Sequence, residues 1–254
     1  MFKFGLKLWS INDNYVKDAL RLFNEGVYQY IELYVKPGSY EKFIGLWKNL
    51  PIPYVIHAPH FRDGMNLAKR ENEAKNLTLI QEAQRFADQL KADKLIVHPG
   101  IAGDIKETAR QLKLINDKRI LIENKPYYAL DDNLVCNGTT PEEIKLVMDE
   151  AGVGLCLDIG HAACSARAHS VYYLDYLKQF MMLAPKMFHL ADGDVNNLTD
   201  DHRHIGEGNF DFRQILAIIH DNAMVTIEVN KSSKENLNDF IKDVKMIKAI
   251  KGVA

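Results

Sequence analysis

The chain has 254 residues, of which 47% are hydrophobic, and its formal net charge at pH 7 is −2. This composition excludes a disordered chain, and the near-neutral charge gives no global indication of nucleic-acid binding, although a local basic patch could still contact phosphates. Three cysteines without a CxxC pair, and no apolar run near the roughly 20 residues of a membrane span, predict reduced thiols in a soluble cytoplasmic protein without a membrane partner.

Eight short apolar runs recur along the chain. Most are rich in Val, Ile, Leu or aromatic residues without strict alternation, as expected of buried parallel strands. They cover residues 4–9, 28–35, 54–58, 94–100, 119–124, 154–160, 187–191 and 224–229. Segments with helical spacing of apolar residues lie between or after them, at 14–26, 71–92, 139–152, 209–222 and 235–252. The segment 139–152 also has a Thr-Pro start and a terminal glycine, which are typical helix boundaries.

This alternation predicts an α/β protein. Eight strand–helix pairs in about 250 residues are typical of a (β/α)8 TIM barrel, here a single domain over residues 1–254. A doubly wound open sheet also alternates strands and helices. The count of eight, and the absence of an early GxGxxG motif, favour the barrel.

Seven of the eight runs end in a histidine or an acidic residue. These residues are Glu32, His57, His98, Glu123, Asp158, His189 and Glu228. One strand-end histidine alone is more often structural, and Glu32 could simply pair with Lys36. In a barrel, however, the strand ends meet at one mouth, where catalytic groups lie. Crowding so many carboxylates there is costly unless cations are present, so the pattern predicts metal binding. Histidine with carboxylate suits zinc, manganese or iron better than calcium or magnesium.

The stretch TDDHRHIGEGN at 199–209 follows the seventh run and is either a solvated loop or part of a metal site. Asp200 and His202 alternate by two, which puts both side chains on one face of an extended segment. Asp158 and His161 straddle the end of the sixth run, so one points into the mouth and the other to its rim. Three further potential ligands, His161, Asp200 and His202, thus lie near the same mouth.

In their order, these motifs resemble the endonuclease IV family within the xylose isomerase-like barrel superfamily. The resemblance runs from about residue 54 to 229. It rests on IHAPH (56–60) with Asn66-Leu67 beyond it, VHPG (97–100), IEN (122–124), LDIGH (157–161), HLAD (189–192), DDHRHIGEGN (200–209) and IEV (227–229). Each motif is weak alone, and their order on successive strands gives the resemblance its strength.

The resemblance implies that nine side chains hold three divalent metal ions, usually Zn²⁺, with Mn²⁺ as a possibility. The sets are His57, His98 and Glu123 for the first ion, Asp158, His189 and Glu228 for the second, with Glu123 bridging, and His161, Asp200 and His202 for the third. It implies phosphodiester hydrolysis on abasic-site DNA, in DNA repair, or on another phosphoester, with Glu123 and Glu228 as catalytic residues. Asp201 and His204 then become neighbours rather than ligands. No obligate protein partner is implied.

The sequence departs from that family in the loops that grip DNA. VKPGSYEKF lacks an Arg/Gln insertion, and KPYYALDDN (125–133) replaces a glycine-rich turn. His60 stands where the family commonly has a tyrosine. We predict substrate contacts at His60, Tyr127, Arg203 and Glu32.

Two alternatives stay open. The sugar isomerase/epimerase branch of the superfamily implies one divalent metal, a small sugar substrate and proton transfer by two carboxylates. Its ligands would be Glu123, Asp158, His189 and Glu228. Arg203, FGLKLWS and Glu32 fit that branch, whereas His57, His98 and the Asp-x-His pair have no role in it. The third possibility is a metal-dependent binding protein on a former enzyme barrel, which a missing ligand would favour.

Overall fold

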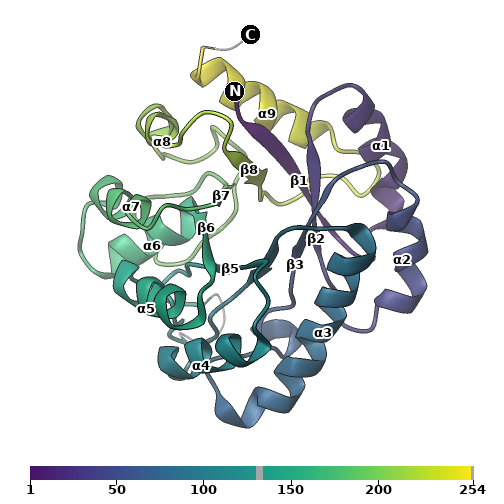
Figure 1. The fold of residues 1–254 in the computed structure, drawn as a ribbon. Coiled ribbons are helices and arrows are strands. Elements are labelled where there is room, and N and C mark those ends of the chain that lie inside the picture. The colour runs from purple at the N-terminus through teal and green to yellow at the C-terminus, as the bar shows by residue number, and fades with distance from the viewer. Residues whose placement is uncertain (130–133, 253–254) are drawn as a thin grey trace.

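A computed structural model describes residues 1–129 and 134–252. The remaining part of the KPYYALDDN segment, 130–133, and residues 253–254 lie outside the described residues. Eight parallel strands close into a barrel in chain order (Figure 1). They are β1 (Lys3–Trp9), β2 (Tyr30–Tyr34), β3 (Tyr54–His57), β4 (Leu95–Val97), β5 (Ile120–Glu123), β6 (Gly154–Asp158), β7 (Met187–Leu190) and β8 (Met224–Ile227). Strand β1 pairs with both β2 and β8, which confirms the TIM barrel and excludes an open sheet.

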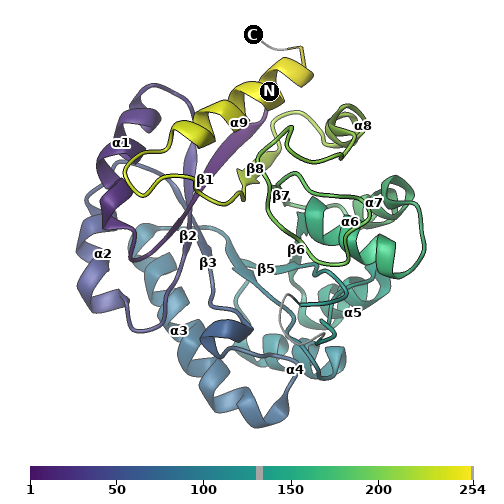
Figure 2. The same cartoon turned by 180° about the vertical axis from the view of Figure 1, so that it is seen from behind.

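Helices surround the barrel in both views (Figures 1 and 2). They are α1 (Val16–Asn24), α2 (Tyr40–Lys48), α3 (Glu73–Leu90), α4 (Ile105–Ile115), α5 (Pro141–Ala151), α6 (Ile159–Ala168), α7 (Tyr173–Met181), α8 (Phe212–Ile218) and α9 (Asn238–Ile250). The predicted segments correspond to α1, α3, α5, α8 and α9. Helix α6 escapes prediction because nearly all of its residues are buried, so no polar face marks its period.

The predicted boundaries of α5 are present. The Thr140 hydroxyl accepts a hydrogen bond from the Glu143 backbone N–H, and Pro141 occupies the first turn. The helix ends at Gly152, whose φ of 67° lies in the left-handed region that glycine adopts without strain. None of the described helices is long and apolar enough to cross a bilayer.

The interior of the barrel has an apolar layer with a polar layer above it. One apolar cluster draws a residue from each of six successive strands: Tyr30, Val55, Ile96, Leu121, Cys156 and Met187. Two positions later in sequence stand Glu32, His57, His98, Glu123, Asp158 and His189. Side chains two apart on a strand point to the same side. The polar layer at the carboxyl ends of the strands therefore rests directly on apolar packing.

Gly5 on β1 makes room for that packing. A Cβ atom at this position would lie 2.4 Å from the ring of Tyr30. The Tyr30 hydroxyl lies 2.9 Å from the Thr226 hydroxyl on β8, so this ring fills the space across β1 and satisfies its own polar atom.

Candidate metal centre

Glu123 stands at the centre of the polar layer. Its Oε2 atom lies 3.1 Å from Nε2 of His57 and 3.1 Å from Nε2 of His98. His57 Nδ1 donates to the Ala58 carbonyl at 2.8 Å, so in the neutral ring Nε2 carries the lone pair. Burial lowers the pKa of His98 well below its ordinary value, against the opposing effect of Glu123. Neutral imidazoles facing a carboxylate form a donor set suited to a divalent ion.

A second group surrounds Nδ1 of His189. This atom lies 2.8 Å from Glu228 Oε2, 3.6 Å from Glu123 Oε2 and 3.7 Å from Asp158 Oδ2. His189 Nδ1 and Glu228 Oε2 are buried and paired with each other, and neither has a further hydrogen-bond partner among the described residues. Burial opposes a charged imidazole here, but Cys156, Glu32 and Glu228 raise the pKa of His189 well above its ordinary value. The same surroundings favour a metal cation at Nδ1.

The third group joins α6 to the loop after β7. Nε2 of His161 lies 3.7 Å from Asp200 Oδ2, a buried oxygen without a hydrogen-bond partner in the described chain. His202 Nδ1 donates to the Glu228 carbonyl at 2.9 Å, and its backbone N–H donates to Asp200 Oδ1 at 3.1 Å. Gly160 allows the approach, because a Cβ there would lie 2.7 Å from Asp200 Oδ2.

All nine predicted ligands fall within groups of three or more side chains that could hold a metal ion. The grouping departs from the prediction in the second set. Glu32 takes the place of Asp158 beside His189 and Glu228, and Asp158 groups with Glu123 and His161 instead. Since each of the nine candidates has such partners, the missing ligand that would favour a former enzyme does not occur among them.

Glu32, a predicted substrate contact, does not line the cavity at the mouth. The side chain is fully buried and accepts a hydrogen bond from His189 Nε2 at 2.8 Å. The alternative in which Glu32 pairs with Lys36 does not occur, since Lys36 pairs with Asp63 at 2.5 Å. Glu32 points inward from β2 beneath the mouth, so it orients His189 instead of reaching the cavity.

The partner of Glu32 is Lys7, a buried lysine that the sequence did not single out. Lys7 Nζ lies 3.1 Å from Glu32 Oε1 and 2.5 Å from Glu228 Oε1. Burial opposes its charge, yet Glu228 and Glu32 raise the pKa of Lys7 above its ordinary value. The sequence does contain an indication of this position. Lys7 lies two residues after Gly5, so both face the inward side of β1.

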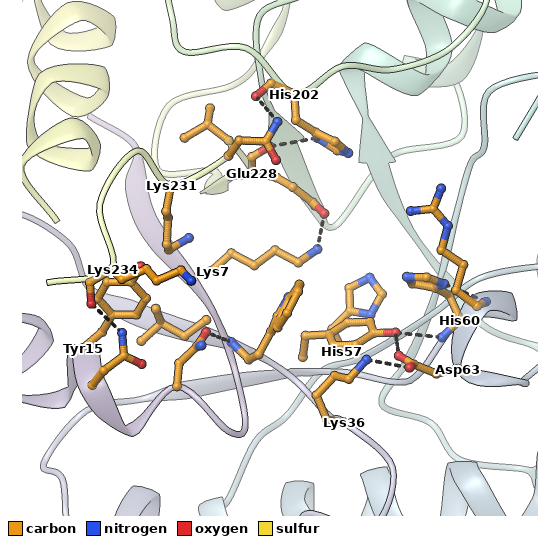
Figure 3. A pocket seen from close by; sticks show the side chains of 18 of the residues that line it. Lys7, Tyr15, Lys36, His57, His60, Asp63, His202, Glu228, Lys231 and Lys234 are labelled. Atoms are coloured by element: carbon orange, nitrogen blue, oxygen red, sulfur yellow. Dashed lines mark hydrogen bonds and ion pairs between the residues drawn. The ribbon is translucent and has the colours of Figure 1, made fainter. Parts of the chain in front are cut away.

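A cavity of about 770 Å³ opens above this layer (Figure 3). Of the predicted substrate contacts, His60 lines it, whereas Tyr127 and Arg203 are not among its lining residues. Tyr127 packs edge-on against Tyr128 and His169, and Arg203 pairs with Asp201 at 2.6 Å. Five cationic side chains line the cavity against the carboxylates of Asp63 and Glu228; they are Lys7, Lys36, Arg62, Lys231 and Lys234. The cavity is therefore suited to an anionic ligand.

The loop TDDHRHIGEGN divides as predicted. His204 lies away from the metal groups, with Nδ1 2.9 Å from Asp243 and Nε2 3.0 Å from Ser232. The glycine turn is held by Asp192, whose Oδ2 accepts from the backbone of Gly206 at 2.9 Å and Gly208 at 3.0 Å. A Cβ at Gly208 would lie 2.1 Å from a backbone carbonyl, so this close approach requires glycine. The turn fixes the course of the chain just after Asp200 and His202.

Comparisons with known proteins agree with this architecture. Residues 23–250 match the family described as xylose isomerase-like TIM barrel. A probable endonuclease 4 of Carboxydothermus hydrogenoformans is 33% identical over 43% of this chain and 41% of its own length. Two solved structures share the fold. A D-tagatose 3-epimerase-like protein has a TM-score of 0.73 at 20% identity, covering 98% of this chain and 97% of its own. Endonuclease IV from Thermus thermophilus has a TM-score of 0.70 at 19% identity, covering 98% and 99%.

Proposed function

The chain belongs to the xylose isomerase-like TIM-barrel family, and from this premise we propose that it is a metal-dependent phosphodiesterase of the endonuclease IV type. The proposal is supported mainly by the potential metal ligands that lie outside the group around His189. A single-metal sugar enzyme has no need of the His57–His98 pair or of Asp200 with His202. Here both converge on the same mouth as Glu123 and Glu228.

The residues present fit divalent ions. His57, His98 and Glu123 would hold the first, Asp158, His189 and Glu228 the second, and His161, Asp200 and His202 the third. Asp200 Oδ2, a buried oxygen without a hydrogen-bond partner among the described residues, and the close pair of His189 Nδ1 and Glu228 Oε2 lie within these groups and support the assignment. Bound ions, zinc or manganese, would supply positive charge and Lewis acidity for phosphoester hydrolysis.

The protein's own side chains would prepare the reaction. Glu228 lines the cavity with its Oε2 atom 2.8 Å from His189 Nδ1, and in our proposal this carboxylate orients the attacking water. Lys7 holds the other oxygen of Glu228 at 2.5 Å and so fixes the direction of Oε2 (Figure 3). Lys231 and Lys234 would attract the anionic ester to the cavity, because no salt bridge of the described chain occupies either ammonium group.

The substrate proposed is a phosphoester, with abasic-site DNA as the first candidate. Two measurements test the proposal. Purified protein should bind close to three equivalents of zinc or manganese, and a duplex with one abasic site should be nicked at that site. His98→Ala and Asp200→Ala should each lose most of the activity, because each removes a ligand from a different group. His220→Ala is the matched control, since this exposed histidine belongs to none of the ligand groups and its ring nitrogen Nδ1 donates to the Asp221 carbonyl.

One equivalent of metal would contradict the proposal. Metal binding without nicking would reject abasic DNA and move the assay to other phosphate esters.

The geometry around His189 also favours a second candidate, a sugar or sugar-phosphate isomerase or epimerase. Nδ1 of His189 faces Glu123, Asp158 and Glu228 at 2.8–3.7 Å, which is a complete ligand set for one ion. Carboxylates beside such an ion could move a proton next to a carbonyl. This function predicts one metal equivalent and turnover of a ketose, with His98→Ala retaining the activity.

A further inference from the structure

Lys125 lies inside the metal centre. It follows β5 directly after Asn124, and it is only 9% exposed. Its ammonium Nζ lies 3.5 Å from Glu123 Oε1, 3.3 Å from His161 Nδ1 and 3.2 Å from His161 Nε2. A cation of the chain itself therefore stands between Glu123 and the third group of ligand candidates.

The ammonium group of Lys125 lies against the ring of His161, nearly equidistant from its two nitrogens at 3.3 and 3.2 Å. His161 Nδ1 donates to the Asn124 carbonyl at 2.9 Å, so in the neutral ring Nε2 holds the lone pair. The charge of Lys125 therefore lies close to the nitrogen that a metal ion would use. Nε2 is also the atom that faces Asp200 Oδ2, at 3.7 Å, and Asp200 Oδ2 has no hydrogen-bond partner in the described chain.

A third metal ion needs the same nitrogen. Zinc binds imidazole nitrogen at about 2.0–2.1 Å, and two cations that share one nitrogen as neighbour lie within about 5 Å of each other. Like charges this close repel in a buried site where water screens them poorly. The presence of Lys125 beside His161 should therefore lower the affinity of this residue for the third ion.

We propose that Lys125 is a built-in cation that competes with the third metal ion for His161. The inference rests on the proposed trinuclear function and adds an order of filling to it. The first two ions bind tightly, and the third binds more weakly because the Lys125 side chain must first leave His161. The backbone of Lys125 is fixed by a 2.9 Å hydrogen bond to the Gly138 carbonyl, so the exchange involves the side chain.

The test counts ions and measures their affinities, independently of any catalytic assay. Metal-free wild-type protein and Lys125→Met are titrated with Zn²⁺ or Mn²⁺ by calorimetry, and bound ions are counted by native mass spectrometry. Wild type should show two tight ions and one weaker ion. Lys125→Met should bind the third ion at least about tenfold more tightly, as expected when one like charge leaves a buried site. Lys125→Arg keeps the charge and should leave the third ion weak.

Lys36→Met is the matched control. Lys36 lines the cavity above the polar layer and pairs with Asp63 at 2.5 Å, so its removal should leave all three affinities unchanged. Three equally tight ions in wild type, or equal third-ion affinity in wild type and Lys125→Met, would overturn the inference. These outcomes leave the proposed hydrolase intact, whereas a single ion in every variant refutes both.

Discussion

The mouth of the barrel has a floor and a wall that differ in almost every physical respect. We define the floor as the nine ligand candidates with Glu32, Lys7 and Lys125, and the wall as Trp9, Lys36, Lys231 and Lys234. The floor comes mainly from strand ends, and most of its side chains are buried and held by several partners. The wall is half-buried or exposed, and Trp9 is 50% exposed. In our proposal the floor defines the type of chemistry, and the wall selects the ligand.

The contrast is sharpest between Lys7 and Lys36, which line the same cavity (Figure 3). Lys7 is nearly buried and pairs with the fully buried carboxylate of Glu32 as well as with Glu228, whereas the more exposed Lys36 pairs with Asp63 alone. Lys7→Met should therefore lower the free energy of unfolding of the metal-free protein by about 3–5 kcal/mol, the cost of leaving buried charge unpaired. Lys36→Met should cost only about 0–1 kcal/mol.

Urea unfolding of both variants measures this difference. Zinc should restore part of the stability of Lys7→Met, because a bound cation replaces the lost charge beside Glu228. Adding Glu32→Gln to Lys7→Met should recover part of the loss in the absence of metal, since it removes one of the stranded carboxylates. If the two single variants are equally stable, the distinction between floor and wall fails.

The sequence predicted the floor far better than the wall, and the reason is the regularity of strands. Inward positions on a strand recur every two residues, and all strand ends of a barrel share one mouth. His57, His98 and Glu123 could therefore be placed together without any knowledge of the loops. Lys7 escaped because a lone lysine in an apolar run resembles a surface residue, although Gly5 two positions before it faces the barrel interior.

The wall and Lys125 depend on how the loops run, which local spacing does not encode. Lys231 and Lys234 follow β8, and their place beside Lys7 and Trp9 results from the closure of β1 against β8. Lys125 follows Asn124, whose side-chain amide donates to the Asp158 carbonyl at 2.9 Å and so ties the start of this loop to β6. Glu32 was misplaced for a related reason. The sequence places Glu32 near the end of its strand, but it does not show how far below the cavity the side chain lies.

Lys231 offers a pH test of the wall. Burial lowers the pKa of Lys231 to about 8, although Asp239 and Glu228 raise it. The ammonium group is charged below this pKa and neutral above it. Affinity for an anionic phosphoester should therefore fall by a few-fold as the pH rises from about 7 to about 9, where an ordinary lysine stays charged. Lys231→Met should bind more weakly at the lower pH and lose the decrease.

Binding is measured with a non-hydrolysable phosphoester, and Lys234→Met serves as the matched control. Lys234 lies on the same loop and is exposed, so its variant should bind more weakly but keep the pH dependence. The same pH profile in wild type and Lys231→Met would remove Lys231 from the binding wall.

Replacing Trp9 should have the smallest effect on affinity, and the fluorescence of Trp9 should report directly on binding at the wall. The chain has two tryptophans, and Trp47 is fully buried whereas Trp9 is half exposed in the cavity. Lys36 Nζ lies 5.4 Å from the centroid of the Trp9 ring. A bound anion that pairs with Lys36 should therefore change the electrostatic environment of Trp9. Titration with the same phosphoester should therefore change the intrinsic fluorescence.

Trp9→Phe should lose this fluorescence change. Its affinity in a competition assay should fall only a few-fold, because the ring supplies contact area rather than charge. An unchanged signal in Trp9→Phe would mean that Trp47 reports binding from a distance, and the wall would then not be the surface that the ligand meets.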